Sequence, residues 1–167
     1  MTRLEIAAIF IGVTVFASNA GAGKVNLPHE GMYTFEFCPI GTAKTFSDDD
    51  KFFVMTYDLN AVTRTTPPGQ AFDRLGSRCY GIFANVSGRL QDSGFCEFTD
   101  LDGDRFWMDY VGHADGGGGT HRVVHGTGKY DGMTLKGEYR IDLDWGSISD
   151  EVAFQGCNPN KGSYKLK

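Results

Sequence analysis

The sequence of 167 residues has no cluster of basic residues, few prolines and no long apolar stretch after its N-terminal segment. Its 16 Lys and Arg are scattered and its formal net charge is −5. Because a phosphate backbone requires a basic surface, this composition argues against a nucleic-acid partner. No segment of the mature chain is apolar enough to cross a membrane. Five Pro beside 23 Gly indicate many turns and bulges rather than disorder.

Several catalytic and cofactor-binding signatures are also missing. The sequence contains no Ser-His-Asp order, no nucleophile elbow and no H-E-x-x-H motif. The segment GTGKYDG (126–132) has its third glycine one place late for a dinucleotide fingerprint, and a strand pattern rather than a helix follows it. We interpret this segment as a sharp corner in which Gly128 provides backbone freedom. Lys129 is then expected to bind no phosphate and to matter little for stability, and no cofactor is predicted.

The N-terminal segment has the features of a secretory signal peptide. Arg3 precedes an apolar run from Ile6 to Ala17, and small residues follow at the positions that a signal peptidase reads. This run is too short to span roughly 30 Å of hydrocarbon. We therefore predict a signal peptide over 1–22, a single mature domain over 23–167, and export to a periplasm or to the extracellular space.

Export to an oxidising compartment predicts that the four cysteines form disulfides. None of them is spaced as C-x-x-C, which argues against a zinc ribbon or a redox motif. Cys79 begins one predicted strand and Cys96 ends the next. The two cysteines would face each other if these strands form a hairpin. Cys38 lies in the first predicted strand and Cys157 in the last, so these two meet only if the sheet closes on itself. We predict the pairs Cys79–Cys96 and Cys38–Cys157.

Alternation of apolar and polar residues dominates the mature chain. The clearest example is GEYRIDLDW (137–145), in which Tyr139, Ile141, Leu143 and Trp145 share one face. About eight such segments are separated by turn residues, and no amphipathic helix is convincing. The pattern predicts an all-β fold, a small closed antiparallel barrel, with a two-sheet sandwich as the alternative. A barrel of this size is either filled by side chains or holds one small ligand.

The segment GSRCYGIFANVSGRLQDSGFCEFTDLDGDRFWMDYVG and the later GTGKYDGMTLKGEYR resemble a family of exported bacterial β-barrel proteins of uncharacterised role. The glycine corner also resembles that of the allene oxide cyclase and dirigent barrel superfamily. The resemblance covers roughly residues 76–145 and implies a barrel. That superfamily includes cyclases of oxidised lipids, proteins that steer radical coupling, and binding modules. None of its catalytic residues could be matched to a position of this chain, so none is assigned.

The segment DLDGD could hold calcium through Asp100, Asp102 and Asp104. Its spacing departs from an EF-hand loop, because the glycine precedes the third aspartate and the twelfth position is Val111. A β-turn is therefore favoured, and calcium binding stays the alternative.

His121 and His125 lie four positions apart in THRVVH. On a regular strand they would share a face but lie about 13 Å apart, too far to ligate one ion. No metal site is predicted. One of these histidines could still act alone as an acid or a base.

Five residues are candidates for ligand binding: Trp107, Asp109, Tyr110, Arg122 and Tyr139. If Asp109 and Arg122 pointed into the barrel, they would form the polar centre of an aromatic pocket. If they pointed outward, they would form an ordinary ion pair across two strands, and the outward arrangement is favoured. Two functions stay open: a barrel that binds a small apolar molecule or a partner, and a cofactor-free cyclase or isomerase. The sequence names neither a ligand nor an oligomeric state.

Overall fold

The structure is a computed structural model and describes residues 27–49, 51–141 and 154–167. The predicted signal peptide over 1–22 lies outside the described residues, as do Leu143 and Trp145. Export therefore stays a prediction. Among the described residues, no helix has both the length and the hydropathy of a membrane span.

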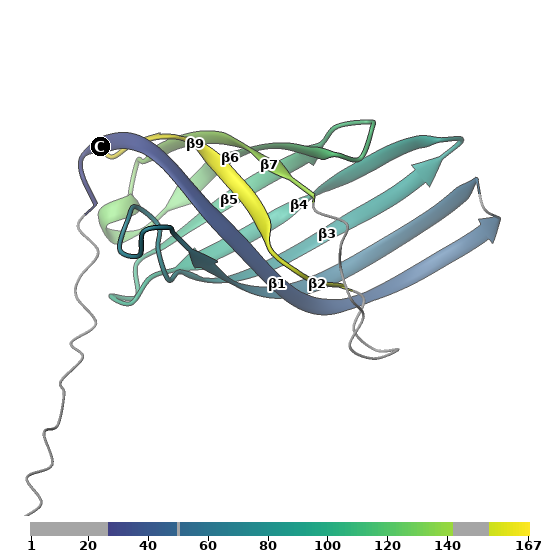
Figure 1. The fold of residues 1–167 in the computed structure, drawn as a ribbon, viewed down its shortest axis with the longest axis horizontal. Helices are drawn as coiled ribbons and strands as arrows, with labels where there is room; N and C mark the ends of the chain where they lie inside the picture. Colours follow the sequence, from purple (N-terminus) through teal and green to yellow (C-terminus); the bar gives the residue numbers. More distant parts are fainter. Residues whose placement is uncertain (1–26, 50, 142–153) are drawn as a thin grey trace, which may run out of the picture.

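The described chain is almost entirely β-structure (Figure 1). A single short 3-10 helix, η1 (Gly128–Tyr130), interrupts the described strands. The strands are β1 (Glu30–Asp49), β2 (Phe52–Arg64), β3 (Gly76–Val86), β4 (Arg89–Thr99), β5 (Arg105–Gly112), β6 (Gly118–Gly126), β7 (Thr134–Arg140), β8 (Phe154–Gln155) and β9 (Asn158–Lys165).

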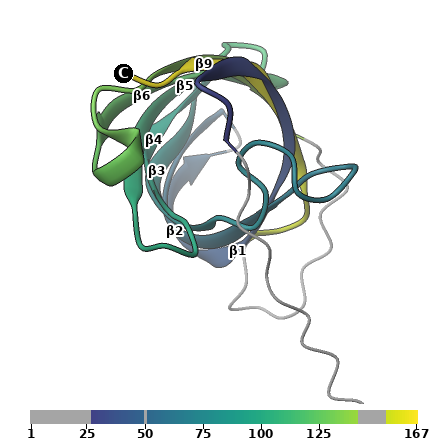
Figure 2. The same cartoon turned by 90° about the vertical axis from the view of Figure 1, so that its left-hand side faces the viewer.

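The sheet closes on itself. Strands β1 to β7 pair in sequence order, β7 pairs with β9, and β9 returns to β1, with every pair antiparallel. The short β8 continues the edge made by β9, because Gln155 opposite Ile40 and Asn158 opposite Phe37 keep one register. Figure 2 views the resulting ring end-on. The predicted closed barrel of eight strands is confirmed, and the sandwich alternative is wrong.

Both predicted disulfides are present. Cys79 lies directly opposite Cys96 in the β3–β4 register, and their bond is buried in the barrel. Cys38 of β1 is joined to Cys157, which lies between β8 and β9. This second bond fastens the C-terminal part of the chain to the first strand, where the barrel closes.

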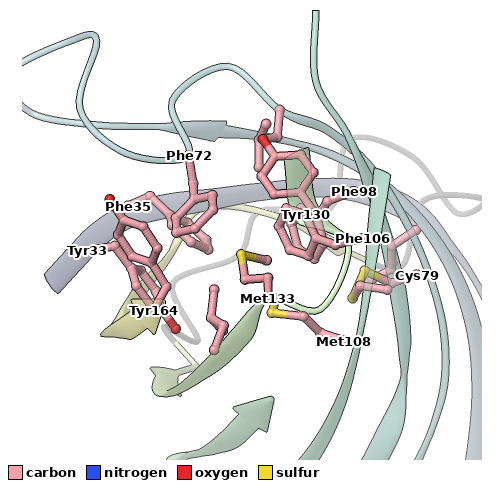
Figure 3. Close-up of a cluster of buried hydrophobic side chains, with 14 residues drawn as sticks. Tyr33, Phe35, Phe72, Cys79, Phe98, Phe106, Met108, Tyr130, Met133 and Tyr164 are labelled. Atoms are coloured by element: carbon pink, nitrogen blue, oxygen red, sulfur yellow. A yellow bond between two sulfur atoms is a disulfide. The ribbon is translucent and has the colours of Figure 1, made fainter. Parts of the chain in front are cut away.

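An aromatic plug fills one end of the barrel (Figure 3). Phe72 comes from the loop between β2 and β3, and its ring lies edge-on to Tyr33, Phe106 and Tyr164, with centroids 5.4, 5.6 and 5.0 Å away. Phe98 stacks on Phe106 at 4.9 Å. Such ring pairs add to the stabilisation that burial of the rings provides.

The loop that carries Phe72 is held by buried polar groups. The Asp73 carboxylate accepts hydrogen bonds from the backbone amides of Thr65 and Gly69, each at 2.8 Å. The Thr63 hydroxyl donates to the Phe72 carbonyl at 2.5 Å. These bonds satisfy backbone groups that the plug buries, so the loop keeps Phe72 inside the barrel.

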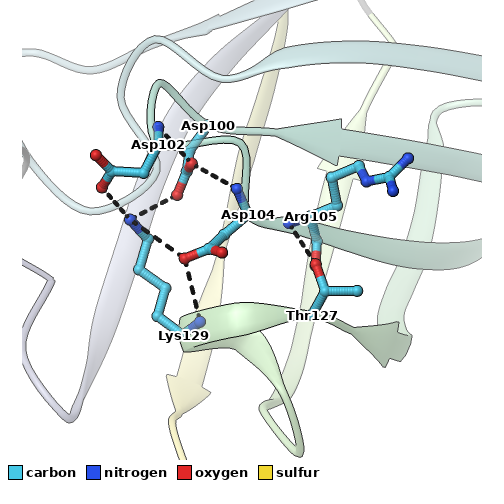
Figure 4. Close-up of polar contacts among 6 residues, drawn as sticks. All are labelled: Asp100, Asp102, Asp104, Arg105, Thr127 and Lys129. Atoms are coloured by element: carbon cyan, nitrogen blue, oxygen red, sulfur yellow. Dashed lines mark hydrogen bonds and ion pairs between the residues drawn. The ribbon is translucent and has the colours of Figure 1, made fainter.

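The glycine corner packs against the aspartate turn (Figure 4). Asp100 Oδ1 accepts the amides of Asp102 and Asp104, at 2.9 and 3.1 Å, which closes the turn. The Lys129 ammonium lies 2.6 Å from Asp100 Oδ2 and 2.9 Å from Asp102 Oδ2. The corner thus has a structural role, and the Lys129 ammonium is the cation that these carboxylates surround. That Lys129 matters little for stability stays a prediction.

Gly128 has a φ of +54°, and a Cβ added to it would overlap the Asp104 carboxylate. We expect Gly128→Ala to lower the free energy of unfolding by about 2–3 kcal/mol, from backbone strain together with displacement of Asp104. Gly103→Ala is the matched control, since Gly103 has a φ of +88° but open space around its Cβ. It should cost only about 1 kcal/mol in urea unfolding. Equal losses in the two variants would show that the contact with Asp104 contributes nothing.

Candidate ligand-binding site

The barrel interior also holds a cavity of about 140 Å³, which lies next to the aromatic plug. Most of its walls are apolar: Phe37, Pro39, Leu59, Phe83, Phe98, Met108, Ile141 and the Cys79–Cys96 disulfide. Polar side chains reach it from six strands: Tyr57, Asp92, Tyr110, His121, Tyr139, Asn158 and Asn160. Alternation along the strands brings these side chains inward.

Four of the polar residues form one hydrogen-bonded group, named here the carboxylate–tyrosine cluster: Tyr57, Asp92, Tyr110 and Tyr139. Asp92 Oδ1 accepts the Tyr57 hydroxyl at 2.6 Å, and Asp92 Oδ2 accepts the Tyr139 hydroxyl at 2.7 Å. The hydroxyls of Tyr57 and Tyr110 are 2.5 Å apart. Because Tyr57 gives its proton to Asp92, Tyr110 is the donor to Tyr57.

Burial dominates the electrostatics of this cluster. The side chain of Asp92 lies inside the barrel at only 9 % exposure. Burial raises the pKa of its carboxyl, while the hydrogen bonds from Tyr57 and Tyr139 act in the opposite direction. Burial also raises the pKa of each of the three tyrosines, with a further contribution from the nearby Asp92 charge. The phenols therefore stay neutral and act as donors.

His121 is a second buried polar group, on β6. Its Nε2 is hydrogen-bonded to the Tyr33 hydroxyl at 2.5 Å, and its ring stacks on Tyr139 with centroids 6.4 Å apart. Burial lowers the pKa of His121 to about 4, so the imidazole is neutral at neutral pH. Gly137 makes this arrangement possible, because a Cβ there would overlap the Tyr33 hydroxyl.

A bulge separates the two histidines that the sequence placed on one face. Trp107 pairs with His125 but Met108 pairs with Val123, so Val124 is an extra residue in β6. The extra residue reverses the alternation. His121 consequently points into the barrel, whereas His125 is exposed and stacks on Trp107 at 5.2 Å. The expectation of a shared face is wrong.

The five candidate ligand-binding residues divide between the two faces of the barrel. Tyr110 and Tyr139 line the cavity. Trp107, Asp109 and Arg122 do not, because they occupy the alternate, outward positions. Asp109 and Arg122 form the outward ion pair at 2.9 Å, with Arg122 71 % exposed. Their assignment to the pocket is corrected.

Sequence reasoning did not single out Tyr57 or Asp92. A usable signal was present in RLQDSGFC. Asp92 and Cys96 are four positions apart, so they share one face of a strand, and the predicted disulfide places Cys96 on the inward face. A carboxylate on the inward face of a barrel strand is unusual and points to a polar site.

Comparison with known proteins supports the fold. No family model matches the sequence, and no curated protein matches it. Among solved structures, the chain is similar to one described as the pterocarpan synthase dirigent protein GePTS1, with a TM-score of 0.51 and 9 % identity over 85 % of this chain and 94 % of that chain. The resemblance to the dirigent barrels is thereby confirmed for the architecture, and this protein has the eight-stranded barrel fold of a dirigent protein.

Proposed function

We propose that the protein binds a small, mainly apolar molecule, about the size of a single ring, inside its barrel. The observation that carries this proposal is the cavity of about 140 Å³, with apolar walls and a few convergent polar groups. Such a combination is typical of small-molecule sites. An apolar cavity of about 150 Å³ is large enough to bind benzene. The two disulfides and the predicted signal peptide support the proposal that the protein does so outside the cytoplasm.

A cyclase or isomerase is the second candidate function. It is favoured by one observation: Asp92, with its raised pKa, and a neutral His121 line the same cavity. Groups of this kind transfer protons in enzymes. The name of the similar structure belongs to that protein, and at 9 % identity it brings no catalytic residue to this chain. Binding is therefore the preferred function.

The methionine methyl groups provide a direct test with toluene as the probe. Met108 lines the cavity, Met133 is buried in the aromatic plug, and Met32 is 77 % exposed. In NMR spectra of methyl-labelled protein, toluene should shift the Met108 resonance and leave those of Met133 and Met32 in place. Met108→Leu assigns the signal. A Met108 signal that stays unchanged as toluene reaches its solubility limit would contradict the proposal.

A further inference from the structure

Asp92 is a buried carboxylate without a cationic partner among the described residues. The ion pairs of these residues all involve other carboxylates. Residues 142–153, which follow the cavity residue Ile141, contain no Lys, Arg or His. Burying a carboxylate is costly unless an opposite charge compensates it. Among the described residues, the cavity thus contains a carboxyl group with no opposite charge beside it.

The hydrogen bonds of the cluster determine what it presents to a ligand. Tyr57 and Tyr139 give their hydroxyl protons to Asp92, and Tyr110 gives its proton to Tyr57. All three hydroxyl protons are therefore engaged within the cluster. What stays available on Asp92, Tyr110 and Tyr139 are oxygen lone pairs, which accept hydrogen bonds. The complementary ligand group is a donor.

The aromatic walls favour the same kind of ligand. Rings from Phe37, Phe83, Tyr110 and Tyr139 line the cavity that contains Asp92. The faces of such rings attract organic cations, and aromatic cages are a common means of recognising ammonium groups. The ring edges and the aliphatic wall would meanwhile cover the apolar part of the same molecule.

We infer that the ligand of this cavity is a small organic ammonium ion, in which a protonated amine pairs with Asp92 and an apolar ring fills the remaining space. This inference rests on the proposed binding function and specifies its ligand class. The ammonium supplies both the missing positive charge and the hydrogen-bond donors that the cluster lacks. A neutral alcohol of the same size would supply one donor and no charge.

The other titratable groups that line the cavity do not compete with Asp92 for this role. Tyr57 on β2, Tyr110 on β5 and Tyr139 on β7 surround the carboxylate and are neutral phenols. His121 on β6 is neutral until the pH falls to about 4. Among the described residues that line the cavity, Asp92 is therefore the sole candidate for a charge at neutral pH.

Benzylamine and benzyl alcohol form a matched pair of probes, because they are nearly equal in size and differ in charge. In calorimetric titrations at neutral pH, we expect benzylamine to bind roughly tenfold or more tightly than benzyl alcohol. Asp92→Asn should remove this preference. Asp109→Asn is the control, since it makes the same chemical change to a carboxylate on the outer face and should leave the preference intact.

The outcomes separate this inference from the proposed function. Equal binding of the two probes, or a preference that survives Asp92→Asn, would overturn the ammonium inference and leave the cavity as a binding site. Failure of benzylamine, benzyl alcohol and toluene alike to bind would overturn both.

A second measurement needs no variant. In the wild-type protein, affinity for benzylamine should fall as the pH is lowered and Asp92 takes up a proton, with His121 adding repulsion near pH 4. Affinity for benzyl alcohol should change much less. A ratio of the two affinities that is independent of pH would also overturn the inference.

Discussion

Breaking the Cys38–Cys157 disulfide is expected to lower the free energy of unfolding by about 5 kcal/mol. The bond joins residues 119 positions apart, and a cross-link over such a long loop removes much of the conformational entropy of the unfolded chain. It also fastens the last strand to the first, at the pairing that closes the barrel. Equilibrium unfolding of Cys38→Ala/Cys157→Ala in urea measures the loss.

The two single variants are the control for this prediction. Cys38→Ala and Cys157→Ala, each with its remaining thiol blocked, break the same bond as the double variant. All three proteins should therefore lose nearly the same free energy. Losses that add up in the double variant would show that the side chains act through packing rather than through the cross-link. A loss below about 2 kcal/mol would mean that the unfolded chain stays partly closed without the bond.

The barrel could be predicted because the features that specify it are the alternation of residues along single strands and the pairing of cysteines. Alternation in RFWMDYVG placed Phe106 and Met108 on one face and Trp107 on the other, as the structure shows. The cysteines added two pairings, of which Cys38–Cys157 agreed with the closed sheet that the strand pattern predicted, because these two residues meet only if the sheet closes on itself. Each of these inferences uses residues that a reader can find without knowing the register of the strands.

The interior site depends on register, and register is not local. Tyr57 and Asp92 are separated by 35 positions, and their contact exists because β2, β3 and β4 pair with particular offsets. The bulge at Val124 has no clear mark in the sequence, yet it decides which histidine enters the barrel. A charged pair such as Asp109 and Arg122 attracts notice, but the two groups satisfy each other on the outer face. The residue that carries the site is Asp92, a carboxylate for which the described part of the chain provides no such cationic partner.

The protein is also expected to lose stability as the pH falls from about 6.5 to about 4, because of His121. Burial lowers the pKa of this imidazole from 6.5 in the unfolded chain to about 4 in the folded protein. Between these values the unfolded state binds more protons, so the free energy of unfolding rises with pH and is lost as the pH falls. The difference between these two pKa values corresponds to a change of about 3 kcal/mol in the free energy of unfolding. Asp73 and Asp100 titrate at lower pH, since their pKa values lie below 3.8.

Asp92 opposes this trend, because its raised pKa lets the folded state take up a proton more readily than the unfolded state.

The contribution of His121 to this pH dependence is therefore isolated by comparing variants. His121→Gln keeps a polar group near Tyr33 but does not titrate, and its stability should fall less than that of the wild type over this pH range. His125→Gln changes an exposed histidine on the outer face and should retain the wild-type dependence. Chemical unfolding at a series of pH values distinguishes the two, and identical curves for His121→Gln and the wild type would show that His121 is not held neutral by the barrel.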